Sequence, residues 1–436
     1  MSLFALITVM VVLLTLLAFI LIGVPVYISL GFAGLLGFII TGGISNLAAI
    51  PAAMYGQVDN VVLFAIPLYI IMGEVLASGG LAGQLYDCMS KWLYRVPGGL
   101  AIASVFACAM FGAVCGVSIA GVAAIGPLAV PEMLKRGYDR KLAAGSVASA
   151  GALATLIPPS IVFIVYGSLS LTSISKLFIG GIIPGIILAI LMALYIFGRV
   201  MMNRKLAPTV ASEVTWGEKF RSLFNIVPLL ILTITIFVCL YAGVATATEL
   251  GAIGAVGAII LTRIWNRSFG MKDLYGVFVR SARGTIGIMI IMASAMTFGT
   301  FLNVLRVPDS FVKFSLSLPY DPLVVVLFFM LLIIILGCLI DGISIIVIST
   351  PILLPAIIAM GFDPLWYGII LAINLEMAVI TPPVGLNLYM MKSVVPELKL
   401  EEIIAGAFPF VFVDLVCMLI FIFLPKITLW LPNFVK

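Results

Sequence analysis

The run AGSVASAGALATLIPPSIVFIVYG at residues 144–167 has the composition of a membrane helix with an interruption in its middle. Pro158 and Pro159 remove two consecutive amide donors, and Gly151 adds a flexible position. The helix should therefore break and leave the carbonyl groups just before the prolines without helical partners. Irregular backbone at membrane depth is tolerated only where it is buried in protein or lines a cavity. The segment 142–169 is thus expected to contribute to a functional site.

The same interruption recurs 224 residues later. NLEMAVITPPVGLNLYM at residues 374–390 places Pro382 and Pro383 inside a second broken segment, 364–392. Other residues recur at the same offset, namely Pro127 as Pro351, Pro131 as Pro355, Gly137 as Gly361 and Asp139 as Asp363. The stretch 23–37 is echoed 220 positions later, at 243–257. With 41 Gly and 23 Pro some matches are expected by chance, but an ordered set of this length indicates an internal duplication.

The composition of the chain indicates whether these segments are surrounded by water or by lipid. Of the 436 residues, 64% are apolar and only 9% are charged, whereas a soluble domain carries about 25% charged residues. Most of the chain should therefore lie in lipid. The absence of histidine excludes histidine-based catalysis and histidine metal sites, and the six cysteines form no CxxC pair. The net charge of +5 is attributed to cytoplasmic loops, so no nucleic-acid partner is expected.

The apolar runs predict an all-α integral membrane protein with about ten crossing helices and two re-entrant hairpins. The runs 98–134 and 322–360 are too long for one crossing and carry a break near the middle, so each is expected to enter and leave on the same side. Lysine and arginine residues beside the first hairpin, in the central linker and after residue 262 should be cytoplasmic, with both termini outside. The first apolar run is interpreted as a retained helix, since it has no basic leader or cleavage site.

The duplicated halves should be inverted relative to each other. Each half contains five predicted crossings, an odd number, so the second copy must lie upside down in the membrane. The predicted division is a first repeat at 1–200, an amphipathic arm on the cytoplasmic surface at 201–223, and a second repeat at 224–436. Inverted repeats with broken helices are typical of secondary transporters.

Each broken helix should meet one hairpin tip. The tips offer small residues and oxygen atoms, which are Gly112, Cys115, Gly116, Ser118 and Gly121 in the first and Gly337, Asp341, Gly342, Ser344, Ser349 and Thr350 in the second. Free carbonyls and hydroxyls are ligands for a small hard cation, and the helix N-termini that follow each break attract an anion. Two sodium-type sites should therefore flank one anionic substrate. The side chains expected around the substrate are Ser149, Ser160, Asn374, Glu376 and Asn387.

Five acidic residues are predicted at membrane depth, where a carboxylate is costly unless it faces a cavity or a partner. A functional or site-supporting role is expected for Asp341 and Glu376, which fall inside the constellation. A structural or interface role is expected for Glu74, Glu249 and Asp414.

Three motifs resemble a known family. They are VCGVSIA…GPLAVPEMLKRGYDRKLAAG…IPPSIVFIVYG at 114–167, DGISIIVISTPILLPAIIAMGFDP at 341–364 and NLEMAVITPPVGLNLYMMKS at 374–393. The chain resembles the large, DctM-type membrane subunit of tripartite ATP-independent periplasmic (TRAP) transporters. The resemblance implies elevator-type, sodium-coupled uptake of organic anions across the bacterial inner membrane. It also implies a small Q membrane subunit, expected as a separate polypeptide, and a periplasmic substrate-binding P protein.

The resemblance also implies two sodium sites and no organic cofactor. The first site would comprise Cys115, Gly116, Ser118, Gly151, Thr155, Pro158 and Pro159. The second would comprise Asp341, Gly342, Ser344, Thr381, Pro382, Pro383 and Gly385. The family tip usually reads V-S-G-S-S, whereas Cys115 and Val117 remove two hydroxyls here, so backbone carbonyls and Ser118 should carry the ligation. Ala378 also replaces the glycine usual before the second proline pair.

Three other functions have different requirements. A stand-alone sodium/dicarboxylate symporter of similar architecture would need neither the Q subunit nor the binding protein. An intramembrane enzyme would need paired catalytic aspartates, a Ser-His pair or a DDxxD-like cluster, and the sequence has none, so no enzymatic activity is expected. A channel would need a repeated selectivity loop, which is also missing.

Overall fold

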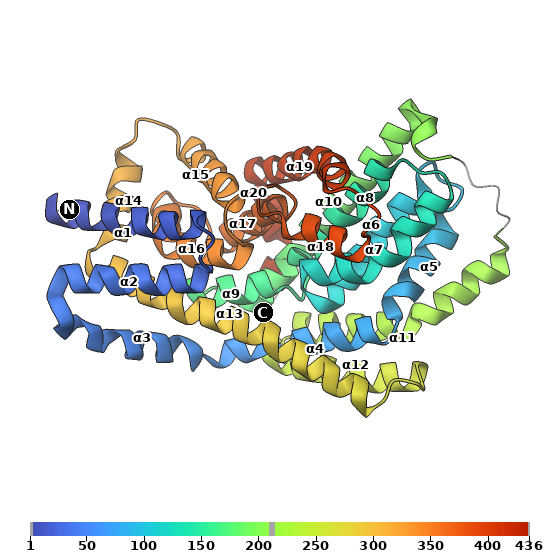
Figure 1. Ribbon diagram of the computed structural model, residues 1–436, viewed down its shortest axis with the longest axis horizontal. Coiled ribbons are helices and arrows are strands. Elements are labelled where there is room, and N and C mark those ends of the chain that lie inside the picture. Colours follow the sequence, from blue (N-terminus) through green and yellow to red (C-terminus); the bar gives the residue numbers. More distant parts are fainter. Residues whose placement is uncertain (1–2, 209–213, 435–436) are drawn as a thin grey trace.

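The computed structural model describes residues 3–208 and 214–434, apart from the side chains at 44–46 and 49, and every regular element in these ranges is a helix (Figure 1). The first half contains α1 (Leu3–Leu21), α2 (Val26–Gly42), α3 (Ala49–Val58), α4 (Ala65–Ser78), α5 (Leu81–Leu93), α6 (Gly99–Cys115), α7 (Ser118–Lys135), α8 (Arg140–Ala150), α9 (Ile161–Ser170) and α10 (Ile174–Met202). The second half contains α11 (Trp216–Tyr241), α12 (Ala247–Trp265), α13 (Met271–Val304), α14 (Val307–Ser317), α15 (Pro322–Gly337), α16 (Gly342–Ala359), α17 (Pro364–Val379), α18 (Leu386–Val394), α19 (Leu400–Phe423) and α20 (Pro425–Trp430). Short 3-10 turns are η1 (Gly43–Ala48), η2 (Val61–Phe64), η3 (Gly151–Thr155), η4 (Arg204–Leu206) and η5 (Pro432–Phe434).

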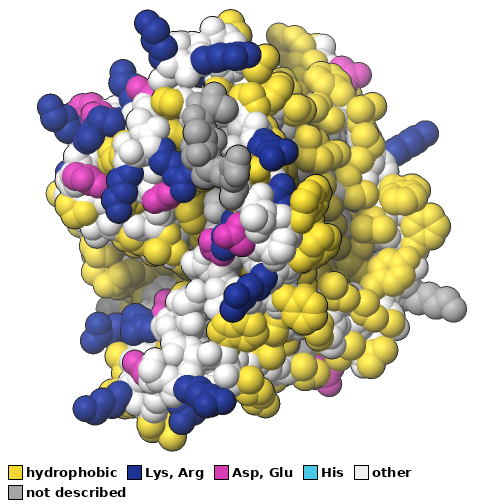
Figure 2. All heavy atoms as spheres, turned by 90° about the vertical axis from the view of Figure 1, so that its right-hand side faces the viewer, with side chains coloured by type: hydrophobic (Ala, Val, Ile, Leu, Met, Phe, Trp, Pro, Cys, Tyr) yellow, Lys and Arg dark blue, Asp and Glu magenta, His cyan; other side chains and the backbone are white. Residues whose placement is uncertain are grey.

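Nine helices of the described residues are long and apolar enough to cross a membrane. They are α1, η2 with α4, α7, α10, α11, α12, α13, α16 and α19. Figure 2 shows lysine and arginine side chains gathered on one part of the surface, while hydrophobic side chains cover another part. The all-α membrane class predicted from composition is confirmed.

Both predicted hairpins and both predicted breaks are present as helix pairs. The pair α6 and α7 turns at Gly116 and Val117, and α15 and α16 turn over residues 338–341. The segment 142–169 is divided into α8, η3 and α9, and the segment 364–392 into α17 and α18. The peptide bonds Pro158–Pro159 and Pro382–Pro383 are both cis.

Two expected boundaries differ from the structure. α11 begins at Trp216, inside the expected arm at 201–223, of which residues 209–213 lie outside the described residues. α13 begins at Met271, so Arg280 and Arg283 lie within a helix instead of a cytoplasmic loop. The physical reason is the same for both: a hydropathy run marks only the lipid-facing part of a helix, whereas lysine, arginine and glutamate are good helix formers and extend it.

Helices from the two halves pack against each other in equivalent pairs. α2 packs on α13, and α12 packs on α4. The repeated glycines form the contact surfaces: Gly34 of α2 lies against the backbone of Thr297 and Phe298, and Gly254 of α12 lies against Met72. Figure 1 shows α2, α3, α4, α12 and α13 along the lower side of the view, with most of the hairpin and broken-helix segments above them. The functional residues described next lie where these two groups of helices meet.

Candidate functional site: a cavity between two hairpin tips

A cavity of about 260 Å³ lies where both hairpin tips, both broken helices, α4 and α13 come together. The first tip contributes Cys115, Gly116 and Ser118, and the second contributes Asp341 and Gly342. Thr155 of the first break also lines it. The structure therefore brings residues of both predicted sodium sites to the wall of one cavity.

Four helices begin at this cavity. The first turns of α7, α9, α16 and α18 supply lining residues, among them Ser118, Ile161, Gly342 and Leu386. Within the described part of the chain, α7, α9 and α18 have no side-chain cap. Free amide groups and aligned peptide dipoles give each such terminus a partial positive charge. The arrangement is suited to an anion.

The first tip and the first break meet through backbone atoms. Ile161 N donates to Gly116 O over 3.4 Å, and a Cβ atom at Gly116 would collide with the carbonyl of Pro159. The Ser160 hydroxyl donates to the carbonyl of Thr155. The Cys115 thiol donates to Val117 O over 3.7 Å, which points the sulfur at its own backbone. The oxygen atoms of this site are thus backbone carbonyls and hydroxyls.

The second tip and the second break meet in a comparable way. Val384 N donates to Cys338 O over 3.2 Å, and a Cβ atom at Gly337 would lie 2.6 Å from the Cβ atom of Ala378. Asp341 is the N-cap of α16, and its two oxygens accept from the amide and the hydroxyl of Ser344. The carboxylate predicted as a sodium ligand therefore also closes the first turn of a helix.

Two side-chain links join the halves behind the cavity wall. Ser118 Oγ donates to Asn387 Oδ1 over 2.9 Å, and Asn387 Nδ2 donates to Ala148 O over 3.0 Å. Thr155 Oγ1 donates to Glu376 Oε1 over 3.3 Å. These bonds tie the first tip and both broken helices into one unit.

The five residues expected around the substrate are all fully buried, and none of them lines the cavity. Asn374 donates from its amide to Met330 O over 2.9 Å. Glu376 and Asn387 hold the links just described, Ser149 lies in α8, and Ser160 is the N-cap residue of α9. These five buried side chains therefore lie behind the residues that line the cavity.

The sequence model of the family described as "Tripartite ATP-independent periplasmic transporter, DctM component" matches residues 13–427 of this chain. The chain belongs to this family. It is a TRAP large permease, and so a transporter subunit and not an enzyme. The family predicted from the three motifs is confirmed.

Relatives of this TRAP large permease align along most of its length. The C4-dicarboxylate TRAP transporter large permease protein DctM of Pseudomonas aeruginosa is 34% identical over 407 residues, 93% of this chain and 94% of that protein. The isethionate TRAP transporter permease protein DctMQ of Oleidesulfovibrio alaskensis is 32% identical over 421 residues, but this chain spans only 64% of its length. The crystal structure of the Alcanivorax borkumensis YdaH transporter, which has an unusual topology, covers 91% of each chain with a TM-score of 0.64 and 16% identity, and so shares the fold.

The permease also holds an ion pair that sequence reasoning missed. Arg280 Nε lies 2.7 Å from Glu74 Oε2, and both residues line the cavity. Arg280 had been expected in a cytoplasmic loop. The available signal was the helical extension of α13: residues 271–283 contain no proline and only one glycine, Gly276, which a helix tolerates, so Arg280 could be placed inside the helix. Glu249, for which a structural or interface role is expected, completes a capping box with Thr246 at the start of α12.

Proposed function

We propose that this permease carries an organic acid anion across the bacterial inner membrane, driven by an inward sodium gradient. The observation that carries the proposal is the meeting of four helix N-termini at one cavity. A carboxylate can replace water at such termini, because the amide groups and the helix dipoles both favour negative charge.

The names of the relatives support the solute class. They include large permeases for C4-dicarboxylates and for 2,3-diketo-L-gulonate, and a permease for isethionate. All three solutes are organic anions. The ectoine permease TeaC of Halomonas elongata, 28% identical, carries a solute that also bears a carboxylate.

The composition of the two tip-and-break contacts supports sodium as the coupling ion. Ser118, Thr155, Ser344 and Thr381 provide hydroxyls near unwound backbone. Unwound carbonyls and hydroxyls are the ligands that transporters use for sodium. Among the described residues no group of three or more Cys, Asp or Glu side chains could hold another metal.

An elevator movement is proposed for the unit formed by the hairpins and broken helices. The links of Asn387 and Glu376 hold this unit together internally. At its contact with α4, Gly73 packs on Cys115, and small residues let two helix backbones approach closely without interlocking side chains. The unit could therefore move as one body past α4 and α13 and carry the cavity with it.

A small permease and a periplasmic binding protein are the proposed partners. The word "tripartite" in the family description and the name of the longer relative DctMQ support this assignment. The alternative of a stand-alone sodium/dicarboxylate symporter predicts uptake without either partner.

The test is uptake by proteoliposomes that contain this permease, its small permease and the loaded binding protein. Uptake should require an inward sodium gradient and both partners. Ser118→Ala should raise the sodium concentration needed for half-maximal uptake by about tenfold, because one charge-assisted contact is removed. Ser317→Ala, at an exposed position on α14, is the matched control. Undiminished uptake after replacement of sodium by choline and potassium would refute sodium coupling.

A further inference from the structure

The Glu74–Arg280 ion pair lies where two cavities meet. The central cavity is lined by both residues and by Ala120 of α7. A second cavity of about 500 Å³ extends between α4, α5 and α7, and the same three residues line it, together with Ser78 and Pro127. The ion pair therefore lies on the wall that the two cavities share.

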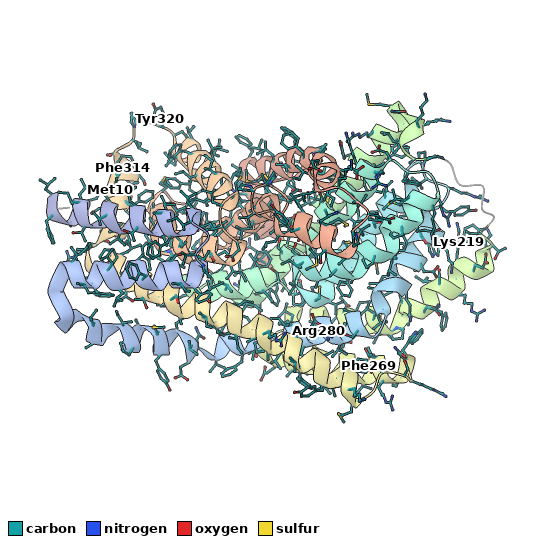
Figure 3. All side chains as sticks on the ribbon, viewed as in Figure 1. Met10, Lys219, Phe269, Arg280, Phe314 and Tyr320 are labelled. Carbon is teal, nitrogen blue, oxygen red and sulfur yellow. The ribbon has the colours of Figure 1, made fainter. Side chains whose placement is uncertain are left out.

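The arginine is held on one side only. Arg280 lies nine residues into α13, about 14 Å along the axis, and Figure 3 shows it where α13 passes α4. Its Nε donates to Glu74 Oε2 over 2.7 Å, and its Nη2 donates to Ser78 Oγ over 2.8 Å. A guanidinium has five N–H donors, so the edge formed by Nη1 and Nη2 keeps donors for a further acceptor. The side chain is 51% exposed, and this edge can be reached.

Charge makes Arg280 distinct among the residues around the central cavity. The charged side chains in its lining are Glu74, Arg280 and Asp341, and the oxygens of Asp341 already cap α16. Arg280 is the positive side chain in this lining, and Glu74 neutralises it. An arginine fork binds carboxylates with two parallel hydrogen bonds, in a geometry that lysine does not reproduce.

We propose that Arg280 binds the carboxylate of the transported anion at the junction of the two cavities, and that Glu74 holds the guanidinium when the anion is absent. The inference rests on the proposed function in one respect, that the solute is an organic anion. The guanidinium is then paired in both states, with Glu74 alone when the anion is absent and with Glu74 and the carboxylate on its Nη1–Nη2 edge when the anion is present. The negative charge of Glu74 beside the bound carboxylate also limits affinity, which permits release.

The alternative is that the Glu74–Arg280 ion pair is a brace, meaning that it only holds α4 and α13 together and binds no solute. A brace and a binding site respond differently to the loss of each partner. If the pair is a brace, Arg280→Gln and Glu74→Gln remove the same contact and should have the same effect. If Arg280 binds the anion, its loss weakens binding, whereas loss of Glu74 removes a negative charge that repels the anion and should strengthen binding.

The first experiment measures sodium-driven uptake by the complete reconstituted system at increasing concentrations of two carboxylates, succinate and 2,3-diketo-L-gulonate. Arg280→Gln should raise the apparent KM about tenfold or more, the loss of a charge-assisted bidentate contact, and Arg280→Lys should raise it less. Glu74→Gln should lower the apparent KM. Arg140→Gln, which breaks the 2.8 Å ion pair with Glu402 between α8 and α19, is the matched control and should leave KM unchanged. Equal losses in the two cavity variants without a change in KM would overturn the inference.

The second experiment needs no transported solute. Ser78→Cys, in the purified permease, is treated with an anionic or a cationic methanethiosulfonate, and the unsubstituted permease supplies the background of its six cysteines. The quantity compared is the ratio of the reaction rate with the anionic reagent to the rate with the cationic reagent. This ratio should be severalfold higher in Ser78→Cys, where Arg280 is present, than in the double variant Ser78→Cys with Arg280→Gln. An unchanged ratio would overturn the anion site. If Arg280→Gln lowers this ratio but the reconstituted system shows no sodium-driven uptake, the anion site is supported and the proposed function is refuted.

Discussion

Gly116 occupies the turn of the first hairpin, where two separate constraints act on one residue. Its backbone has φ +64°, and a Cβ atom added there would collide with the carbonyl oxygen of Pro159. Gly116→Ala should lower the free energy of unfolding by about 2–4 kcal/mol, because the left-handed backbone costs an L residue about 1–2 kcal/mol and the collision adds a similar amount. Thermal unfolding of the purified permease in detergent measures the change.

Gly243→Ala separates these two constraints. Gly243 has φ +66°, but a Cβ atom there would meet no heavy atom within 4 Å. Only the backbone cost of about 1–2 kcal/mol should appear. Equal destabilisation by the two substitutions would show that the contact between the first tip and the first break contributes nothing to stability.

At the residue scale, the sequence predicted backbone features better than side-chain partners. Double prolines and glycines act on their own backbone, so the breaks and the close approach of the tips could be expected from local chemistry. Asn387 could be placed near the constellation, but its bonds to Ser118 and Ala148 depend on the register between helices from different halves. Local patterns carry no information about that register.

α5 and α11 are joined by a lysine that lies among aromatic rings. Lys219 Nζ is 5.8 Å from the ring centroid of Trp92, 5.1 Å from Tyr94 and 4.9 Å from Trp216. Figure 3 shows Lys219 near the start of α11, at the right-hand end of the view. Lys219→Met keeps the length of the side chain and removes its charge, so it should lower the free energy of unfolding by about 0.5–2 kcal/mol.

Two further variants test the cation–π origin of this contact. Lys219→Arg should keep the stability, since a guanidinium also stacks on aromatic faces. Lys272→Met, at an exposed position in the first turn of α13, is the control for the loss of one lysine charge. If Lys219→Met unfolds at the same temperature as Lys272→Met, the contacts of Lys219 with the three aromatic rings do not stabilise the junction of α5 and α11.

The element scale also explains why helix positions were predicted better than helix ends. Hydropathy located α4 and α10 to within a few residues, because the mean hydropathy of both is high along most of their length. It missed the first turns of α11 and α13, where charged residues continue the helix. The capping box of Thr215 and Glu218 fixes the start of α11, and its S/T-x-x-E pattern was readable in the sequence.

For the whole molecule, duplication accounts for contacts that neither half could make alone. The offset of 220 residues pairs Gly34 with Gly254, and each of these glycines lets its helix approach a helix of the other half closely. α2 meets α13 and α12 meets α4, so each half supplies the partner surface for the other. Repeat matching predicted which residues correspond. The packing of α2 on α13 and of α12 on α4 could not be predicted, because the equivalence of two repeats does not specify which of their surfaces touch.

The inverted arrangement predicts opposite exposure of the regions before and after α13. α13 has 34 residues, about 51 Å at 1.5 Å per residue, which exceeds the hydrocarbon thickness of about 30 Å. Basic residues near its start, Arg263, Arg267 and Lys272, indicate the cytoplasmic side, whereas Asp321 lies beside Tyr320 in the loop before α15. Lys272→Cys should therefore react with an impermeant maleimide only after the inner membrane is opened. Tyr320→Cys, which is 65% exposed as tyrosine, should react in intact spheroplasts, with the unsubstituted chain as background. Labelling of both positions from one side would mean that α13 does not separate the two compartments, and the inverted topology would then have to be abandoned.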